Sequence, residues 1–303
     1  MEGGVEKMEI EWLSASAIRD YQHCPRASMM KRQERKAYSK RQSRQSPELL
    51  LGNALHATLR DLHRLCVHEQ LGSQPTCDTY LYLAQRAVAL LNANWSTDAF
   101  EDAHQEEAYF ERAERMLEYY VRSSAMPKGK VLATEADLAR TIRLGGRTLG
   151  LVGRVDRIDL LPQGTIEVID YKLDTSGRMP SSQVLAYDLG TFAQYILTSL
   201  TYREYSTTIS MSHLSLTTLR KVTVRYDEQH IRENLRALDA LAQDIQAGKA
   251  EPRPNAWCPW CAFRVECPAF MVAGDLCDIA QILTDGANME EHASLSDART
   301  LGD

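Results

Sequence analysis

The sequence has no run of about twenty apolar residues, so we expect no segment that spans a membrane. No apolar signal sequence opens it, and its seven cysteines are an odd number. Both features favour a reducing, cytoplasmic location over a secreted protein held by disulfides. Internal repeats and low-complexity segments are absent as well. A chain of 303 residues suits one elaborated domain or two small ones.

The sequence also has no excess of positive charge, which argues against a nucleic-acid-binding protein until the charge is divided along the chain. The net charge is −6, and residues 274–303 alone carry seven acids and one arginine, a balance of 1 − 7 = −6. We expect this acidic tail to be mobile beyond Gly286. The remainder is neutral and includes a basic run with one acid, Glu34. Such a run commonly contacts phosphates, although it is also often a solvated face. Its basic residues are Lys31, Arg32, Arg35, Lys36, Lys40, Arg41 and Arg44.

Two short segments, GRVDRID at 153–159 and EVIDYKLD at 167–174, predict a β-hairpin. If residues 162–164 form a three-residue loop, counting back along both strands sets Asp156 opposite Asp170. Directly opposed side chains lie on one face of a sheet, and Lys172, two residues further, points to that face as well.

Two acids and a lysine in one patch are typical of a hydrolytic metal site. Carboxylates this close repel each other unless a cation or a proton lies between them. A divalent metal would satisfy Asp156 and Asp170, and Lys172 would hold a phosphate oxygen or the attacking water. The alternative is a surface hairpin with ordinary solvated charges.

Three cysteines, Cys258, Cys261 and Cys267, lie within ten residues in WCPWCAFRVECP. With a fourth thiolate they would form the set that an iron–sulfur cluster or a structural zinc ion requires. The spacing does not choose between these metals. Nor does it identify the fourth ligand, which could be Cys24, Cys66, Cys77 or Cys277.

The apolar periodicity predicts helices in the first part of the chain and alternating strands and helices in the second. This order indicates an α/β fold in which the N-terminal helices cap a core with a central sheet. The expected helices cover residues 14–24, 48–69, 79–94, 101–123, 181–205 and 227–248, and the expected strands 131–143, 148–160, 165–173, 208–216 and 219–226.

Five segments, in the same order along the chain, resemble the motifs of RecB-type and CRISPR-adaptation iron–sulfur exonucleases of the PD-(D/E)XK superfamily. They are LSASAIRDYQHCPRASMMKRQER (13–35), GNALH (52–56), GRVDRID, EVIDYK and CPWCAFRVECPAF (258–270). The resemblance implies a restriction-endonuclease-like core, in which a mixed central sheet is flanked by helices, and a cluster lobe that joins both ends of the chain. We therefore divide the chain into a helical region (1–130), a nuclease core (131–250), a cysteine segment (251–273) and the tail (274–303).

The resemblance also implies a role for particular residues. The backbone carbonyl of Tyr171 would bind one or two Mg²⁺ or Mn²⁺ ions together with the side chains of His56, Asp156 and Asp170. A 4Fe–4S cluster would be held by Cys24, Cys258, Cys261 and Cys267, with zinc as the alternative.

Supporting positions are less determined by the resemblance. Glu135 matches an acid common in the family, although it could equally pair across strands with Arg143 or Arg147. The family's Gln-x-x-x-Tyr motif matches Gln183 and Tyr187, or else the helix body sets Thr191 and Tyr195 in those places and the glutamine is missing.

The implied activity is metal-dependent hydrolysis of DNA by an exonuclease that prefers single strands, in recombination or repair. Lys172 would orient the nucleophile. The implied partners are DNA with free ends and proteins of recombination or CRISPR adaptation. The alternatives are a CRISPR-adaptation nuclease that trims spacer precursors and a non-catalytic iron–sulfur adaptor that binds DNA.

Overall fold

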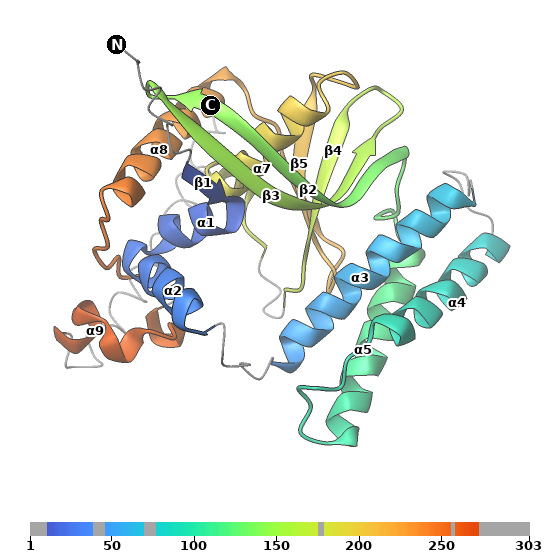
Figure 1. Cartoon of the computed structure of the whole chain (residues 1–303). Helices are drawn as coiled ribbons and strands as arrows, with labels where there is room; N and C mark the ends of the chain where they lie inside the picture. Colours follow the sequence, from blue (N-terminus) through green and yellow to red (C-terminus); the bar gives the residue numbers. More distant parts are fainter. Residues whose placement is uncertain (1–10, 39–45, 70–76, 175–178, 256–257, 273–303) are drawn as a thin grey trace, which may run out of the picture. The chain divides into compact units, whose positions relative to one another are not determined.

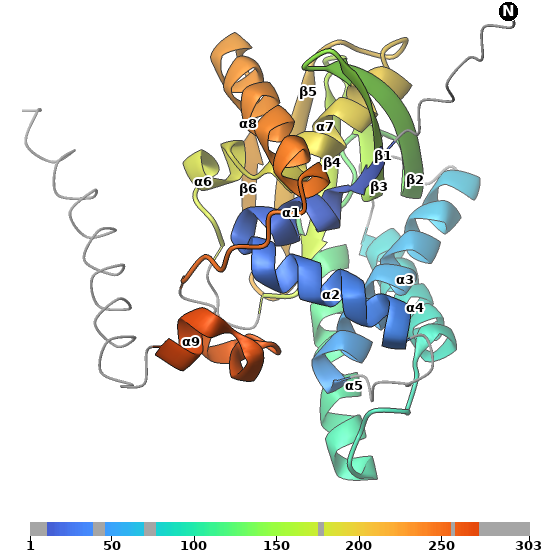
Figure 2. The same ribbon diagram turned by 60° about the vertical axis from the view of Figure 1, so that its left-hand side comes forward.

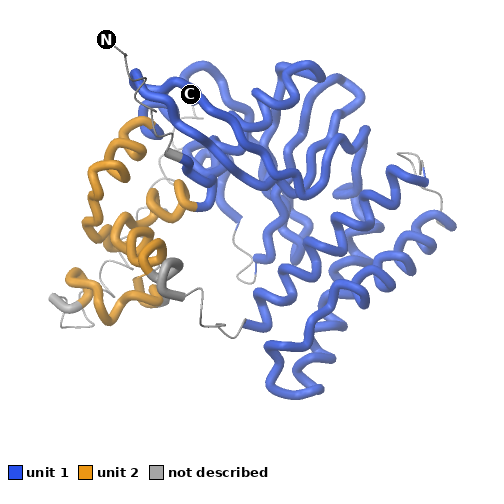
Figure 3. Tube along the Cα trace, in the orientation of Figure 1, with its two compact units in different colours: residues 1–16, 42–238 blue, residues 17–41, 239–303 orange. Residues whose placement is uncertain are grey.

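The computed structural model describes residues 11–38, 46–69, 77–174, 179–255 and 258–272. The chain divides into two compact units, shown in Figure 3. Unit 1 comprises residues 1–16 and 42–238, and unit 2 comprises residues 17–41 and 239–303. Each unit is therefore discontinuous in sequence.

Unit 1 contains a mixed sheet of six strands. Strand β3 (Arg147–Leu160) pairs antiparallel with β2 (Lys130–Leu144) on one edge, and on its other edge β1 (Glu11–Ser14) is parallel and β4 (Ile166–Lys172) antiparallel. β5 (Ile209–Ser215) continues the sheet parallel to β4, and β6 (Lys221–Val224) closes it antiparallel to β5. The α/β fold with a mixed sheet flanked by helices is as the sequence predicts.

The two partners on the second edge of β3 do not meet. β1 pairs with residues 149–152 and β4 with residues 157–160, so residues 153–156 lie between the two ladders. The carbonyl of Arg154 in this interval accepts a hydrogen bond of 2.9 Å from Gln194 Nε2. Where strands separate in this way, backbone N–H and C=O groups lose their partners in the ladder, and side chains can bond to them instead. Asp156 lies at this point.

Three helices form a layer in unit 1 and lie side by side in both Figure 1 and Figure 2. They are α3 (Pro47–His68), α4 (Cys77–Asn94) and α5 (Ala103–Val121). Their apolar faces form one core cluster that includes Ile169, Tyr171 and Leu214 of the sheet. Ser46 accepts from Leu49 N and caps α3, while Asp102 caps α5 by accepting from Gln105 N.

The opposite face of the sheet packs on α7 (Leu189–Thr201), which follows the short α6 (Ser182–Ala186). The expected single helix over residues 181–205 is wrong, because it is interrupted at Tyr187 and Asp188. Asp188 instead begins α7, since its carboxylate accepts from the backbone N–H of Thr191 at 2.6 Å. The apolar periodicity continues through the break, so it gives no sign of it.

The remaining expected elements are present within a few residues of their predicted bounds. Gly145 and Gly146, both with positive φ, form the two-residue turn between β2 and β3. Asp227 accepts from His230 N and caps α8 (Glu228–Gln246). Unit 2 contains α1 (Ala15–His23) from its third residue onward, together with α2 (Pro25–Tyr38), η1 (Cys258–Trp260), η2 (Arg264–Glu266) and α9 (Pro268–Val272).

Candidate metal centre

The hairpin register at the centre of unit 1 is the one that the sequence predicts. Leu161 and Thr165 close the turn, with Leu161 N donating to Thr165 O at 2.8 Å, and pairing continues to Arg157 opposite Ile169. Asp156 and Asp170 follow at the next step, where the ladder ends. The two carboxylates therefore lie where β3 and β4 begin to separate.

Asp156 holds the separating strands together through its side chain. Its Oδ2 accepts a hydrogen bond of 2.6 Å from the backbone N–H of Tyr171. Burial raises the pKa of Asp156, and the nearby charge of Asp170 raises it further, while the hydrogen bond and charge of His56 oppose the rise. The carboxylate thus favours a compensating positive charge next to it.

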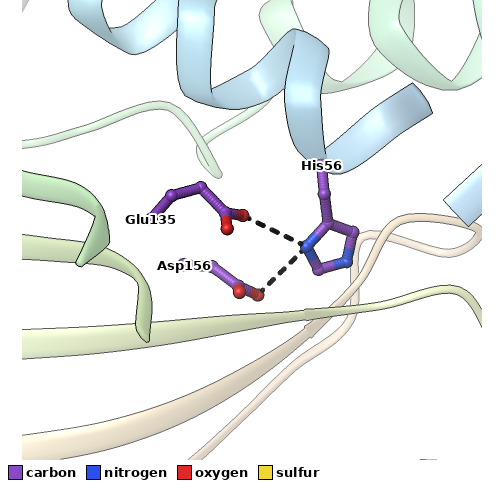
Figure 4. Close-up of side chains that lie close together, drawn as sticks. All are labelled: His56, Glu135 and Asp156. Carbon is purple, nitrogen blue, oxygen red and sulfur yellow. Dashed lines mark ion pairs between the residues drawn. The ribbon is translucent and has the colours of Figure 1, made fainter. Parts of the chain in front are cut away.

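His56 of α3 and Glu135 of β2 complete a cluster with Asp156, shown in Figure 4. His56 Nδ1 lies 3.7 Å from Glu135 Oε1 and 3.5 Å from Asp156 Oδ2. One ligand atom from each of the three residues lies within 4.8 Å of the others. Carboxylate and imidazole donors at this spacing suit Mn²⁺ or Mg²⁺.

The pKa of His56 shows how strongly this cluster attracts a positive charge. Burial by itself lowers the pKa, but hydrogen bonds to Asp156 and Glu135 outweigh it and raise the pKa to about 10. An imidazolium therefore compensates the two carboxylates. A divalent cation can replace that proton, so the residues present fit the metal that the donor set suggests.

Glu135 reaches the cluster from an unusual backbone conformation. Its neighbours Thr134 and Ala136 pair with Arg157 and Val155, so Glu135 stands opposite Asp156. Its φ is 48°, in the left-handed region, which costs on the order of 1–2 kcal/mol for a residue other than glycine. Strain of this kind gathers at functional sites. Glu135 contacts Arg154 at 3.7 Å rather than Arg143 or Arg147.

Asp170 and Lys172 form a second set of contacts beside the cluster. Lys172 Nζ contacts Asp170 Oδ2, and His213 Nε2 of β5 lies 3.2 Å from the same oxygen. Asp170 is outside the three-residue cluster, yet its charge raises the pKa of both His56 and Asp156. Five of the residues expected at the site are therefore close together, namely His56, Glu135, Asp156, Asp170 and Lys172. Sequence reasoning missed His213, which belongs to no motif.

A buried polar network lies on the helical side of the same strands. The guanidinium of Arg157, 2% exposed, donates to the hydroxyl groups of Tyr120 and Tyr171, to the latter at 2.9 Å. Its Nε lies 3.0 Å from Asp159 Oδ2. His63 Nε2 contacts both tyrosines, at 2.9 and 3.1 Å. The side chain of Tyr171 is thus fixed in the core while its backbone N–H contacts Asp156.

The two registers of the glutamine motif lie in different surroundings. Gln183 and Tyr187 are exposed at α6, where Tyr187 donates to Glu233 at 2.9 Å. Thr191, on α7, is buried and its hydroxyl lies 3.2 Å from His213 Nε2. Tyr195 packs on Tyr226, with ring centroids 4.7 Å apart. Thr191, which belongs to the second register, is therefore linked to Asp170, because both residues contact His213.

In unit 2 the cysteine segment runs beside the end of α1. Arg253 N lies 3.5 Å from Cys24 Sγ, and Asn255 N lies 3.2 Å from Cys258 Sγ. Asn255 also donates to the carbonyl of His23 at 3.2 Å. No three of the described cysteine sulfurs lie within 4.8 Å of one another.

The basic run lies partly within α2 and partly outside the described residues. Lys31 pairs with Asp20 at 2.8 Å, and Arg35 and Lys36 belong to α2, but the side chains of the latter two lie outside the description. Outside the described residues are Lys40, Arg41, Arg44, Cys277 and the acidic tail. Within the described part of the chain, every helix is too short or too polar to cross a bilayer.

Comparisons with known proteins bear on the same region. A model of the PD-(D/E)XK nuclease superfamily matches residues 12–268. None of the curated proteins compared matches the chain. Among solved structures, the crystal structure of SSO0001 is similar at 16% identity and a TM-score of 0.31, covering 70% of this chain and 96% of that one.

Proposed function

The chain belongs to the PD-(D/E)XK nuclease superfamily, and we propose that it is a metal-dependent DNA exonuclease that prefers single strands and acts in recombination or repair. The family implies a metal-dependent hydrolase with a nucleic acid as substrate. The observation that carries the proposal is the cluster of His56, Glu135 and Asp156 beside the Asp170–Lys172 pair.

We assign the roles of the residues as the family resemblance implies. A bound Mg²⁺ or Mn²⁺ would lower the pKa of a bound water and neutralise charge on the phosphate. The ligands would be His56, Asp156, Asp170 and the Tyr171 carbonyl, with Glu135 in support. Lys172 Nζ, which contacts Asp170, would orient the water or a phosphate oxygen.

We propose that Cys24, Cys258, Cys261 and Cys267 hold a 4Fe–4S cluster. Backbone N–H groups next to Cys24 and Cys258 Sγ are donors of the kind that tune cluster sulfurs. These two donors are what supports the proposal. A structural zinc ion held by the same four thiolates is the alternative.

A cleavage assay tests the nuclease proposal. Oligonucleotides labelled at the 5′ or the 3′ end, single- or double-stranded, are incubated with the protein and Mn²⁺ or Mg²⁺. We expect metal-dependent trimming of single strands, and its loss in each of Asp156→Asn, Asp170→Asn and Lys172→Ala. Asp137→Asn is the matched control, because Asp137 is an exposed residue of β2 that pairs with Arg154.

Each alternative has its own outcome in this assay. Cleavage retained in Asp156→Asn or Asp170→Asn would refute the assigned site. DNA binding without cleavage by the wild-type protein would favour the non-catalytic adaptor, although the intact acids and lysine argue against it. Preferred trimming of duplexes with single-stranded overhangs would favour the role in CRISPR adaptation.

A further inference from the structure

His213 is a buried residue of β5, 6% exposed, that faces the candidate metal centre. β5 runs parallel to β4 with His213 in register with Asp170, so the two side chains share one face of the sheet. His213 Nε2 lies 3.2 Å from Asp170 Oδ2 and 3.2 Å from Thr191 Oγ1. One ring nitrogen therefore has two oxygen neighbours.

The hydrogen on that nitrogen can be assigned from the neighbours. The hydroxyl of Thr191 donates its hydrogen to Asp188 Oδ1 at 2.6 Å, the same carboxylate oxygen that caps α7. The Thr191 oxygen must then accept from His213, because its own hydrogen is already donated to Asp188. Nε2 therefore carries a hydrogen.

We propose that His213 is a positioning residue for Asp170, set by the series of hydrogen bonds from Asp188 through Thr191. The inference rests on the proposed function, since Asp170 matters as a metal ligand. Lys172 Nζ and His213 Nε2 both lie within ion-pair distance of Asp170 Oδ2, so two positive or N–H groups approach this carboxylate oxygen before metal or DNA arrives. Partners of this type orient ligating groups, and their loss typically costs about 10–100-fold in metal affinity or activity.

The lysine does not make the histidine redundant. Lys172 is on the same strand as Asp170, and its side chain is 35% exposed. Its proposed role is to orient the attacking water or a phosphate oxygen. His213 comes from a neighbouring strand and is held by α7, so it stays in place when the lysine moves to substrate. The ring thus ties the orientation of Asp170 to the start of α7.

Four substitutions test the inference. His213→Leu removes the donor and His213→Gln restores an N–H near Nε2. Thr191→Val keeps the shape of the side chain but removes its hydroxyl. Thr198→Val is the matched control, because Thr198 is fully buried on the same helix and its hydroxyl has no hydrogen-bond partner among the described residues. Each variant is measured for Mn²⁺ affinity by electron paramagnetic resonance, for kcat and KM on a single-stranded oligonucleotide, and for thermal midpoint.

We expect His213→Leu to lose about 10–100-fold in Mn²⁺ affinity or kcat with KM for DNA unchanged. His213→Gln should recover most of the loss, Thr191→Val should show a smaller one, and Thr198→Val should match the wild type. If His213→Leu lowers the thermal midpoint but keeps Mn²⁺ affinity and kcat within twofold, the residue only packs the core and the inference is overturned.

A metal-free measurement separates this inference from the nuclease proposal. In the nitrogen-15 spectrum of the protein without metal, His213 should carry its hydrogen on Nε2, and a ring protonated only on Nδ1 would overturn the inference. A wild-type protein that binds Mn²⁺ without cleaving DNA would refute the nuclease proposal, and the affinities of the variants would then decide the role of His213. Failure of the wild-type protein to bind Mn²⁺ would overturn both.

Discussion

Replacing Asp156 by alanine or by asparagine separates its two roles, as a metal ligand and as a structural acceptor. Both substitutions remove the charge, so both should abolish cleavage. They also relieve the repulsion from Asp170 that raises the pKa of Asp156. Only asparagine keeps an oxygen that can accept from the N–H of Tyr171, which Asp156 Oδ2 accepts at 2.6 Å.

The expected difference in stability between the two variants follows from that hydrogen bond. Tyr171 is 3% exposed, and a buried donor that loses its acceptor costs about 1–3 kcal/mol. Without metal, we therefore expect Asp156→Ala to unfold more readily than Asp156→Asn by about 1–3 kcal/mol. Both variants lose the same ion pair with His56, so the difference between them reports the hydrogen bond alone.

Urea denaturation in the presence of a chelator measures this difference in the free energy of unfolding. Asp137→Ala is the control for an aspartate lost from the neighbouring strand, and its midpoint should change little because Asp137 is exposed and its ion pair with Arg154 is a surface one. An alanine variant as stable as the asparagine variant would show that the Tyr171 N–H does not depend on Asp156. Asp156 would then not hold β3 and β4 together at the point where they separate.

Three further predictions concern other parts of the molecule. Arg157→Leu should lower the free energy of unfolding by about 3–5 kcal/mol in urea denaturation, because it leaves Asp159 as an unpaired buried charge, and a fully stable variant would contradict this. Protein purified anaerobically should be brown and contain iron and sulfide. Serine at any of the four ligand cysteines should bleach it while Cys66→Ser does not, and zinc without iron would favour the structural-zinc alternative. Neutralising four basic residues together should weaken binding to single strands and reduce the slope of log affinity against log salt by roughly 0.7 per lost phosphate contact, whereas an unchanged slope would make the run a solvated face. These four residues are Lys36, Lys40, Arg41 and Arg44.

The hairpin with Asp156 and Asp170 was predictable because local rules determine it. A loop length and a two-residue period fix which residues oppose each other, and the observed register agrees as far as Arg157 and Ile169. The cap at Asp188 is also a local signal, since an aspartate three residues before Thr191 can accept its N–H. The apolar periodicity obscured it, because the pattern alone does not show where a helix stops.

The role of His213 and the burial of Arg157 could not be predicted in the same way. His213 meets Asp170 only because β5 joins β4 in one parallel register, and the two residues are far apart in the sequence. Arg157 reads as an exposed charge between two acids in RVDRID. Its burial depends on Tyr120 and on Asp159, groups that only the folded sheet and helices bring to it.

The discontinuity of unit 2 has a consequence for how the protein is made on the ribosome. The backbone N–H of Arg253 that contacts Cys24 Sγ lies 229 residues after it. At about 5–20 residues per second, Cys24 leaves the ribosome roughly 11–46 s before that partner exists. Unit 1 can complete its sheet during this delay, whereas unit 2 can close only after the last part of the chain has been made.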